Sequence, residues 1–199
     1  MNASVTDQRR TALRARRALD PALRHAASQR ACERIARLPL FKRARDIGLY
    51  WPMTHEADPW PLFEAFSARQ KPYLPRVVDG SLRFIAIDPT RFRHRRSALG
   101  ITEPVDGLQR PVTALDLLIV PLAAFDSAAR RIGMGGGFYD RTLAQVAAGG
   151  GYRGPRLLGL AFDVQRVARI EARPWDVPLD AVAAPARVYR RATCPPRLR

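Results

Sequence analysis

The chain has 199 residues, of which 47% are hydrophobic, and carries a formal net charge of +16. Its length and hydrophobic content favour one folded domain over residues 1–199 and exclude a disordered chain. The longest apolar run, residues 117–125, is too short to cross a membrane, and the first ten residues lack the apolar core of a secretory signal. Because the two cysteines form no disulfide or metal-binding pattern, we expect a cytoplasmic protein. The short apolar run leads us to expect no membrane partner.

Two helices are predicted at the start of the chain. An arginine-rich helical pattern covers residues 6–19, and the pair Asp20–Pro21 then caps and begins a second helix that reaches about Leu38. Apolar residues recur in the second helix at helical spacing, so we expect them to face the core: Leu23, Ala27, Ala31, Ile35 and Leu38.

The middle of the chain alternates between strand and helix signals. Residues 46–52 predict a short strand that a proline ends, and residues 59–70 predict a helix that begins at Pro59 or Pro61. Residues 71–77 and 82–87 predict two further strands, separated by a turn at 78–80.

Residues 115–125, apolar apart from Asp116, predict a strand and loop at the centre of a sheet, covered on both faces. A helix is expected over residues 138–149, strands over 156–162 and 181–185, and a poorly ordered basic tail over 186–199. Alternating strands and helices predict an α/β fold: a three-layer α/β/α domain with a mostly parallel sheet flanked by helices.

The segment ARRIGMGGGFYDRTL, residues 129–143, lies between the apolar strand and the predicted helix. Glycine amides in such a loop can form a concave anion-binding site, to which a helix N-terminus adds positive potential. Arg130 and Arg131 add full charges, and Asp140 in the first helical turn suits a cation that bridges it to phosphate. The string is neither a Walker A motif nor a dinucleotide fingerprint, so on spacing alone a phosphate site and a structural turn are both possible.

Several motifs together resemble the 5-formyltetrahydrofolate cyclo-ligase family. The string PLAAFDSAARRIGMGGGFYDRTL is similar to the family's signature, and further matches follow the family's order over nearly the whole chain: ALR, YWPMTHEAD, YLPRV, LGITEP, GLAFDVQRV and PWDVPLD. The resemblance implies ATP- and Mg²⁺-dependent cyclisation of 5-formyltetrahydrofolate to 5,10-methenyltetrahydrofolate, with release of ADP and phosphate. It implies that the formyl oxygen attacks the γ-phosphate, after which the neighbouring nitrogen closes the ring.

The resemblance also implies roles for individual residues. Arg131 and Asp140 are the expected catalytic residues, and Asp140 and Asp176 the expected Mg²⁺ ligands. Glu56 is expected to bind folate together with Met134, Gly135, Gly136, Gly137 and Phe138. The residues expected at ATP are Arg10, Arg14, Arg131, Gly133, Met134, Gly135, Gly136, Gly137, Phe138 and Tyr139.

Four residues depart from the family's usual pattern. Ala129 replaces a turn glycine, Met134 and Phe138 each replace a tyrosine, and Arg173 stands where a glutamate is often found. Phe138 keeps a ring that could stack on a pterin but lacks the hydroxyl.

The positive charge suggests a second hypothesis, in which the same fold binds folate or RNA without catalysis. Only Lys42 and Lys71 are lysines, and the many arginines are scattered apart from residues 91–96 and the chain ends. Because the aromatic residues that interleave with basic ones in single-strand binding surfaces are missing, we expect no specific nucleic-acid partner. We also expect the protein to be a monomer.

Overall fold

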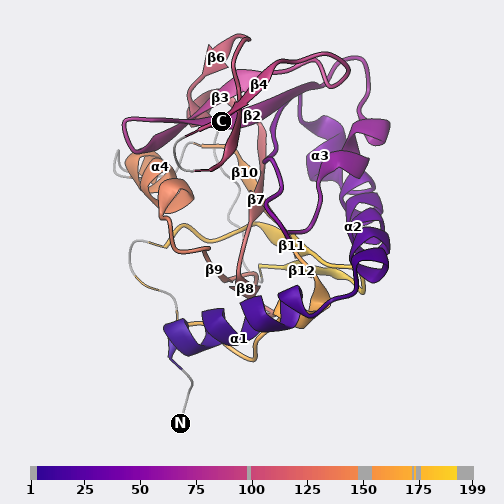
Figure 1. The fold of residues 1–199 in the computed structure, drawn as a ribbon, viewed down its shortest axis with the longest axis vertical. Helices are drawn as coiled ribbons and strands as arrows, with labels where there is room; N and C mark the ends of the chain where they lie inside the picture. Colours follow the sequence, from indigo (N-terminus) through magenta and orange to yellow (C-terminus); the bar gives the residue numbers. More distant parts are fainter. Residues whose placement is uncertain (1–3, 98–99, 148–153, 172, 174–175, 192–199) are drawn as a thin grey trace.

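An eight-stranded sheet in the order β12-β11-β10-β7-β1-β2-β3-β6 forms the centre of the computed structural model, which describes residues 4–97, 100–147, 154–171, 173 and 176–191 (Figure 1). Its strands are β1 (Asp46–Gly48), β2 (Lys71–Val78), β3 (Ser81–Ala86), β6 (Gln109–Arg110), β7 (Leu117–Pro121), β10 (Arg156–Leu160), β11 (Ala181–Ala183) and β12 (Val188–Arg190). The five strands from β11 to β2 are parallel to their neighbours, and β12, β3 and β6 run antiparallel at the two ends. The predicted α/β class and mostly parallel sheet are confirmed.

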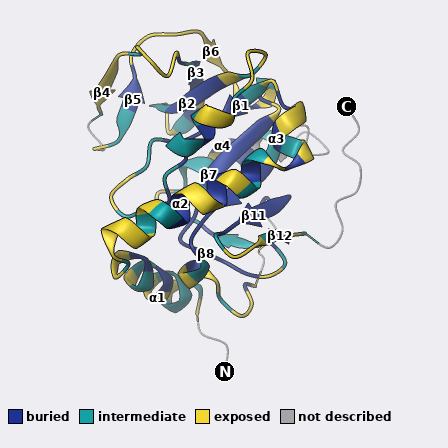
Figure 2. Cartoon of the chain, turned by 90° about the vertical axis from the view of Figure 1, so that its right-hand side faces the viewer, coloured by how far each residue is buried: buried dark blue, intermediate teal, exposed yellow. Residues whose placement is uncertain are grey.

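Strand β7 explains how the sheet is covered on both faces. Its alternate residues Leu117 and Ile119 pack with α2 (Pro21–Ala36) and α3 (Pro39–Arg43), while Leu118 and Val120 pack with α4 (Phe138–Ala147). Figure 2 shows α2 crossing one face of the sheet, with its buried side turned inward. An uninterrupted apolar strand therefore marks the centre of the sheet, as the sequence predicts.

Helix α1 (Val5–Arg17) lies beyond the carboxyl ends of β7 and β10, where it contacts β8 (Ala124–Phe125) and η3 (Asp163–Gln165), the elements that follow those strands. Ser4 caps the helix, since its side chain accepts a hydrogen bond from the Asp7 amide. Ligands of open α/β sheets bind at this edge, and β8 pairs there with β9 (Arg131–Ile132), which leads into the glycine segment.

Four predictions about local structure need correction. Leu23, expected in the core, is 62% exposed in the first turn of α2, whereas Ala27, Ala31, Ile35 and Leu38 are buried as predicted. The helix expected over residues 59–70 is only a 3₁₀ helix, η1 (Trp60–Ala65), whose three-residue turn places the Trp60 ring against the Phe63 ring, and the chain is extended again at Phe66. The strand expected over residues 46–52 ends at Gly48. The tail expected from residue 186 contains β12, whose pairing with β11 orders residues 188–190; residues 192–199 lie outside the described part, as do 148–149 of the helix expected over 138–149.

Elements that the sequence analysis did not predict are short. They are the helix α3, the hairpin of β4 (His94–Arg96) and β5 (Thr102–Pro104), the pair β8 and β9, the strand β6, and the 3₁₀ turns η2 (Val112–Ala114) and η3. None of the helices in the described residues is long and apolar enough to cross a membrane.

Candidate active site

Two pockets meet at the glycine segment between β9 and α4. The larger, of about 470 Å³, is lined by five arginines and is called here the arginine pocket; the smaller, of about 290 Å³, is called the apolar pocket. Arg131, Gly133 and Asp140 line both. A ligand in one pocket therefore lies next to a ligand in the other.

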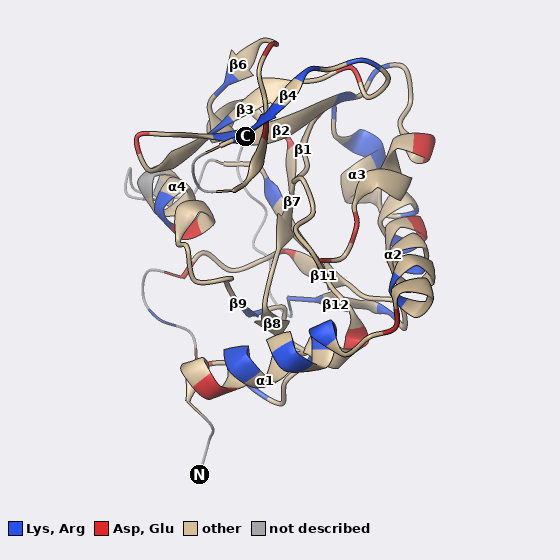
Figure 3. Ribbon diagram, viewed as in Figure 1, with Lys and Arg blue, Asp and Glu red and all other residues tan. Residues whose placement is uncertain are grey.

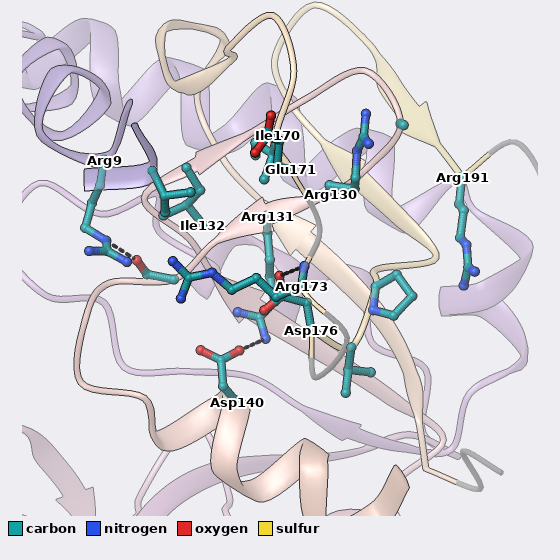
Figure 4. Close-up of a pocket in the computed structure, with 15 residues that line it drawn as sticks. Arg9, Arg130, Arg131, Ile132, Asp140, Ile170, Glu171, Arg173, Asp176 and Arg191 are labelled. Atoms are coloured by element: carbon teal, nitrogen blue, oxygen red, sulfur yellow. Dashed lines mark hydrogen bonds and ion pairs between the residues drawn. The ribbon is translucent and has the colours of Figure 1, made fainter. Parts of the chain in front are cut away.

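The arginine pocket has the charge of an anion site. Arg9, Arg130, Arg131, Arg173 and Arg191 line it, against the three acids Asp140, Glu171 and Asp176 (Figure 4). The Arg9 Nε donates to the Gly133 carbonyl at 3.0 Å, which ties helix α1 to the glycine segment. An excess of arginines around a concave surface favours phosphate or carboxylate ligands.

The pair Arg131–Asp140 stands at the junction of the two pockets. An Arg131 Nη2 donates to the Asp140 Oδ1 at 2.5 Å; the Arg131 side chain is 6% exposed and that of Asp140 is 41% exposed. The Arg131 Nε is buried without a hydrogen-bond partner. Since a buried N–H without an acceptor is costly, this atom is a candidate donor to an oxygen of a bound ligand.

Buried Asp126 holds the wall of the arginine pocket together. It accepts hydrogen bonds from the amides of Ala128, Arg130 and Ile170 at 3.0, 3.1 and 2.9 Å, and pairs with the Arg130 side chain at 2.7 Å. The turn that it closes contains Ala129 at φ 59°, in the left-handed region, which explains why a glycine is the expected residue there.

The glycine segment brings the backbone close to charged groups. A Cβ on Gly133 would lie 3.2 Å from the Asp140 Oδ2 and 3.5 Å from an Arg131 nitrogen. Gly135 and Gly137 have φ angles of +109° and +68°, which other residues rarely adopt. The segment then enters α4, which places Asp140 in the first helical turn.

Two buried acids, Glu56 and Glu103, line the apolar pocket, and Glu103 accepts a hydrogen bond from the Val77 amide at 3.0 Å. Glu56 is the one that the sequence analysis assigned to folate. Its carboxylate accepts a hydrogen bond from the Met53 amide at 2.9 Å and lies 3.9 Å from an Arg16 nitrogen, with both charged side chains at most 5% exposed. Burial raises the pKa of Glu56, and the Met53 amide and Arg16 partly oppose this. Burial, followed by the charge of Glu56, also raises the pKa of Tyr50 and of Tyr139, so both phenols stay protonated.

Most of the predicted site residues come together. Those that line a pocket are Glu56, Arg131, Gly133, Met134, Gly136, Gly137, Phe138, Tyr139, Asp140 and Asp176. Gly135 lies between them in the same segment. Asp140 and Asp176 share the arginine pocket, although no group of three potential metal-binding side chains occurs in the described part of the chain.

The predicted ATP residues Arg10 and Arg14 line neither pocket. Both are exposed, and Arg10 pairs with Asp7 on the surface of α1 at 2.6 Å. A helix turns by about 100° per residue, so the face that carries Arg9 and Arg16 toward the site turns these two side chains away. The structure therefore identifies three site residues that sequence reasoning missed, namely Arg9, Arg16 and Asp126.

The sequence and fold match proteins of known activity. A model of the 5-formyltetrahydrofolate cyclo-ligase family matches residues 2–185. The 5-formyltetrahydrofolate cyclo-ligase of Escherichia coli K12 is 34% identical over 180 residues, which cover 87% of this chain and 96% of that protein. The enzyme of the same name from Haemophilus influenzae is 33% identical over 191 residues, with 90% and 97% covered. The solution structure of Aquifex aeolicus 5,10-methenyltetrahydrofolate synthetase superposes with a TM-score of 0.80 at 27% identity and covers 98% of this chain.

Proposed function

The chain belongs to the 5-formyltetrahydrofolate cyclo-ligase family, and we propose that its two adjoining pockets bind ATP and folate during that reaction. The enzyme converts 5-formyltetrahydrofolate to 5,10-methenyltetrahydrofolate, as its relatives' names state. The observation that carries the proposal is the sharing of Arg131, Gly133 and Asp140 by an arginine-lined and an apolar pocket. The non-catalytic alternative does not account for this junction.

We assign the arginine pocket to the phosphates of ATP. Its excess of arginines, the buried Arg131 Nε without a protein partner and the close-lying backbone at Gly133 all fit a bound phosphate. Arg9, whose Nε donates to the Gly133 carbonyl, is the residue of α1 that we add to this assignment, while Arg10 and Arg14 are assigned to ATP by the resemblance alone. Asp140 and Asp176, which line the same pocket, would hold Mg²⁺, and the ion would help to neutralise the charge of the phosphates.

The apolar pocket is assigned to the pterin. Glu56 accepts hydrogen bonds there from the ring N–H and amino group, and the Phe138 ring offers a face for stacking. Burial of Glu56 makes this recognition sensitive to its protonation, because a neutral carboxyl group is a weaker acceptor.

The reaction then occurs at the junction of the two pockets. The formyl oxygen attacks the γ-phosphorus, the bond from phosphorus to the ADP oxygen breaks, and ADP leaves. The substrate's N10 next attacks the formyl carbon and loses its proton, and the carbon–oxygen bond breaks to release phosphate. Arg131 neutralises charge that develops on the phosphoryl group, and the two pockets hold the reacting atoms close together.

The decisive experiment follows formation of the methenyl product by its near-ultraviolet absorbance. We expect turnover only when ATP and a divalent cation are both present. Equal turnover without ATP would refute the assignment of the arginine pocket, and equal turnover after complete chelation would refute the role of Asp140 and Asp176. A non-catalytic protein would bind 5-formyltetrahydrofolate without any change in absorbance.

The remaining expectations are independent of the chemistry. A monomer formed by one domain over residues 1–199 predicts a single species of about 22 kDa in sedimentation. Weak nucleic-acid binding that collapses between low and physiological salt is expected of scattered arginines. A cytoplasmic location is checked by fractionation of cells that express the protein.

A further inference from the structure

A tight turn over residues 53–56 presents Glu56 to the apolar pocket. The Glu56 amide donates to the Met53 carbonyl at 2.9 Å, and the Met53 amide donates to the Glu56 carboxylate at 2.9 Å. His55, inside this turn, has a φ angle of 69°, in the left-handed region that residues other than glycine rarely adopt. Because a residue keeps such a conformation only where its surroundings hold it, the turn requires support from outside.

Helix α2 supports the chain on both sides of Glu56. Before it, an Arg24 Nη1 lies 2.5 Å from the His55 Nδ1. After it, the Asp58 amide donates to the Ser28 hydroxyl at 3.0 Å, and that hydroxyl donates to the Arg24 carbonyl, also at 3.0 Å. Arg24 and Ser28 are one helical turn apart, so a single face of α2 fixes the segment that carries Glu56.

The contact between Arg24 and His55 determines the protonation of the imidazole. A guanidinium group has only donors, so the His55 Nδ1 must accept with its lone pair. The ring is therefore neutral, with its proton on Nε2. A protonated His55 has no lone pair at Nδ1 and would place a second positive charge against Arg24, so the contact breaks when the ring gains a proton.

The surroundings of His55 favour the neutral ring. The charged groups of the neighbouring elements that act on it are all cations in the described part of the chain: Arg24 of α2, and Arg16 and Arg17 of the basic helix α1 (Figure 3). Burial, followed by these three charges, lowers the pKa of His55 from its ordinary 6.5. The Glu56 carboxylate beside it is directed at the Met53 amide and Arg16. His55 is thus neutral at neutral pH and gains its proton on mild acidification.

We propose that neutral His55, as the acceptor of Arg24, is a positioning residue for folate, because it holds the turn in the conformation that presents Glu56 to the apolar pocket. His55 lines neither pocket, so it acts through Glu56 and does not touch the substrate. The inference rests on the proposed function, which assigns Glu56 to the pterin. Protonation of His55 releases the turn, so affinity for folate falls on the acid side, while the phosphoryl step beside Arg131 is unchanged.

Three replacements of His55 separate the contact from the backbone conformation. Asparagine tolerates the left-handed conformation and offers an acceptor oxygen that does not titrate; glycine tolerates the conformation but offers no acceptor, and alanine does neither. At about pH 7.5 we expect the KM and the calorimetric Kd for 5-formyltetrahydrofolate to rise about tenfold in His55→Gly and His55→Ala, the effect of losing one hydrogen bond to a charged group. His55→Asn should stay within about twofold, and kcat should change little in all three.

The pH profile tests the titration itself. Between about pH 7.5 and about pH 5 the Kd of the unaltered protein should rise more steeply than that of His55→Asn, which keeps Glu56 and has no titrating group at position 55. His25→Asn is the matched control, because it removes an exposed histidine from the position next to Arg24, and His25 lines neither pocket. It should keep both the affinity and the pH dependence of the unaltered protein.

Unaltered affinity in His55→Ala would overturn the inference, as would equal pH dependence of the unaltered protein and His55→Asn. Hydrogen exchange of the protein without ligands provides a readout that needs no substrate. At one pH, the Met53 and Glu56 amides should exchange faster in His55→Ala than in His55→Asn, and equal exchange would show that the contact does not hold the turn. If the protein neither binds nor cyclises folate, the proposed function fails, and the exchange rates still decide whether His55 holds the turn.

Discussion

Replacement of Arg16 by methionine tests how the buried charge at Glu56 is maintained. The two side chains lie 3.9 Å apart and are at most 5% exposed. At an effective dielectric constant of about 20, two unit charges at this distance attract by about 4 kcal/mol. Methionine keeps a long apolar side chain in the same space, so the variant mainly removes the charge. We therefore expect the free energy of unfolding at about pH 7 to fall by about 3 kcal/mol, as when a buried pair loses one partner.

The loss should depend on pH in a direction set by Glu56. Burial raises the folded-state pKa of Glu56 above its ordinary 4.5, so the folded chain binds this proton more tightly than the unfolded chain. The tighter binding of this proton therefore stabilises the folded state at low pH, and this stabilisation is lost as the pH rises through the folded pKa of Glu56. Without Arg16 the pKa rises further, so the loss becomes larger and extends to higher pH. At about pH 4 the carboxyl is protonated in both folded proteins, and the destabilisation should disappear.

Urea denaturation of the unaltered protein, Arg16→Met, Glu56→Gln and the double variant gives the coupling free energy directly. We expect the double variant to recover at least half of the loss, because it leaves no unpaired buried charge. A destabilisation of Arg16→Met that is equal at about pH 4 and pH 7, or a coupling below about 0.5 kcal/mol, would refute the electrostatic reasoning and leave only packing.

Three further changes test the site and the core. Asp140→Asn should still bind ATP but turn over about a hundredfold more slowly, with its melting temperature shifted by no more than about 2 °C, because the carboxylate is 41% exposed; full activity would remove its metal role. Gly133→Ala should weaken ATP binding in calorimetry, because its Cβ would crowd Asp140 at 3.2 Å, whereas a Cβ on Gly136 would crowd the Phe138 ring of the apolar pocket at 3.2 Å and should weaken folate binding instead. Burial raises the pKa of the Cys32 thiol to about 12, so in a Cys194→Ser background a thiol reagent at about pH 8 should react only after denaturation; rapid reaction of the native protein contradicts that burial.

The parts of the fold that sequence predicts well are those whose burial determines their composition. Strand β7 lies between two layers of helices, so all of Leu117 to Val120 must be apolar, and the run is visible without alignment. Strand β4 lies at the surface, where His94, Arg95 and Arg96 are all exposed, and no alternation marks it as a strand. Its pairing is visible only in three dimensions.

The site divides in a similar way. The glycines and Asp140 are contiguous in sequence, so their spacing alone predicts a phosphate loop as one of two possibilities. Glu56 and Asp176 are isolated acids without a local pattern, and only the family resemblance identified them. Asp126 lies in the signature string, but one of the three amides that donate to it belongs to Ile170, which is 44 residues away.

Helix α1 shows why a resemblance needs geometry beside it. The helix contains five arginines, and a surface helix in a strongly basic chain gives no reason to prefer one of them. Its apolar residues do: Val5 and Ala12 lie seven residues apart, on the face that packs on β8 and η3, and Arg9 and Arg16 repeat the same seven-residue step on that face. That step brings Arg9 to the Gly133 carbonyl and Arg16 to the Glu56 carboxylate. Arg10 and Arg14 lie outside this step, so exchange of either for glutamine should change ATP affinity less than Arg9→Gln does. A larger effect at Arg10 would contradict this reasoning and support the assignment of Arg10 to ATP by the resemblance.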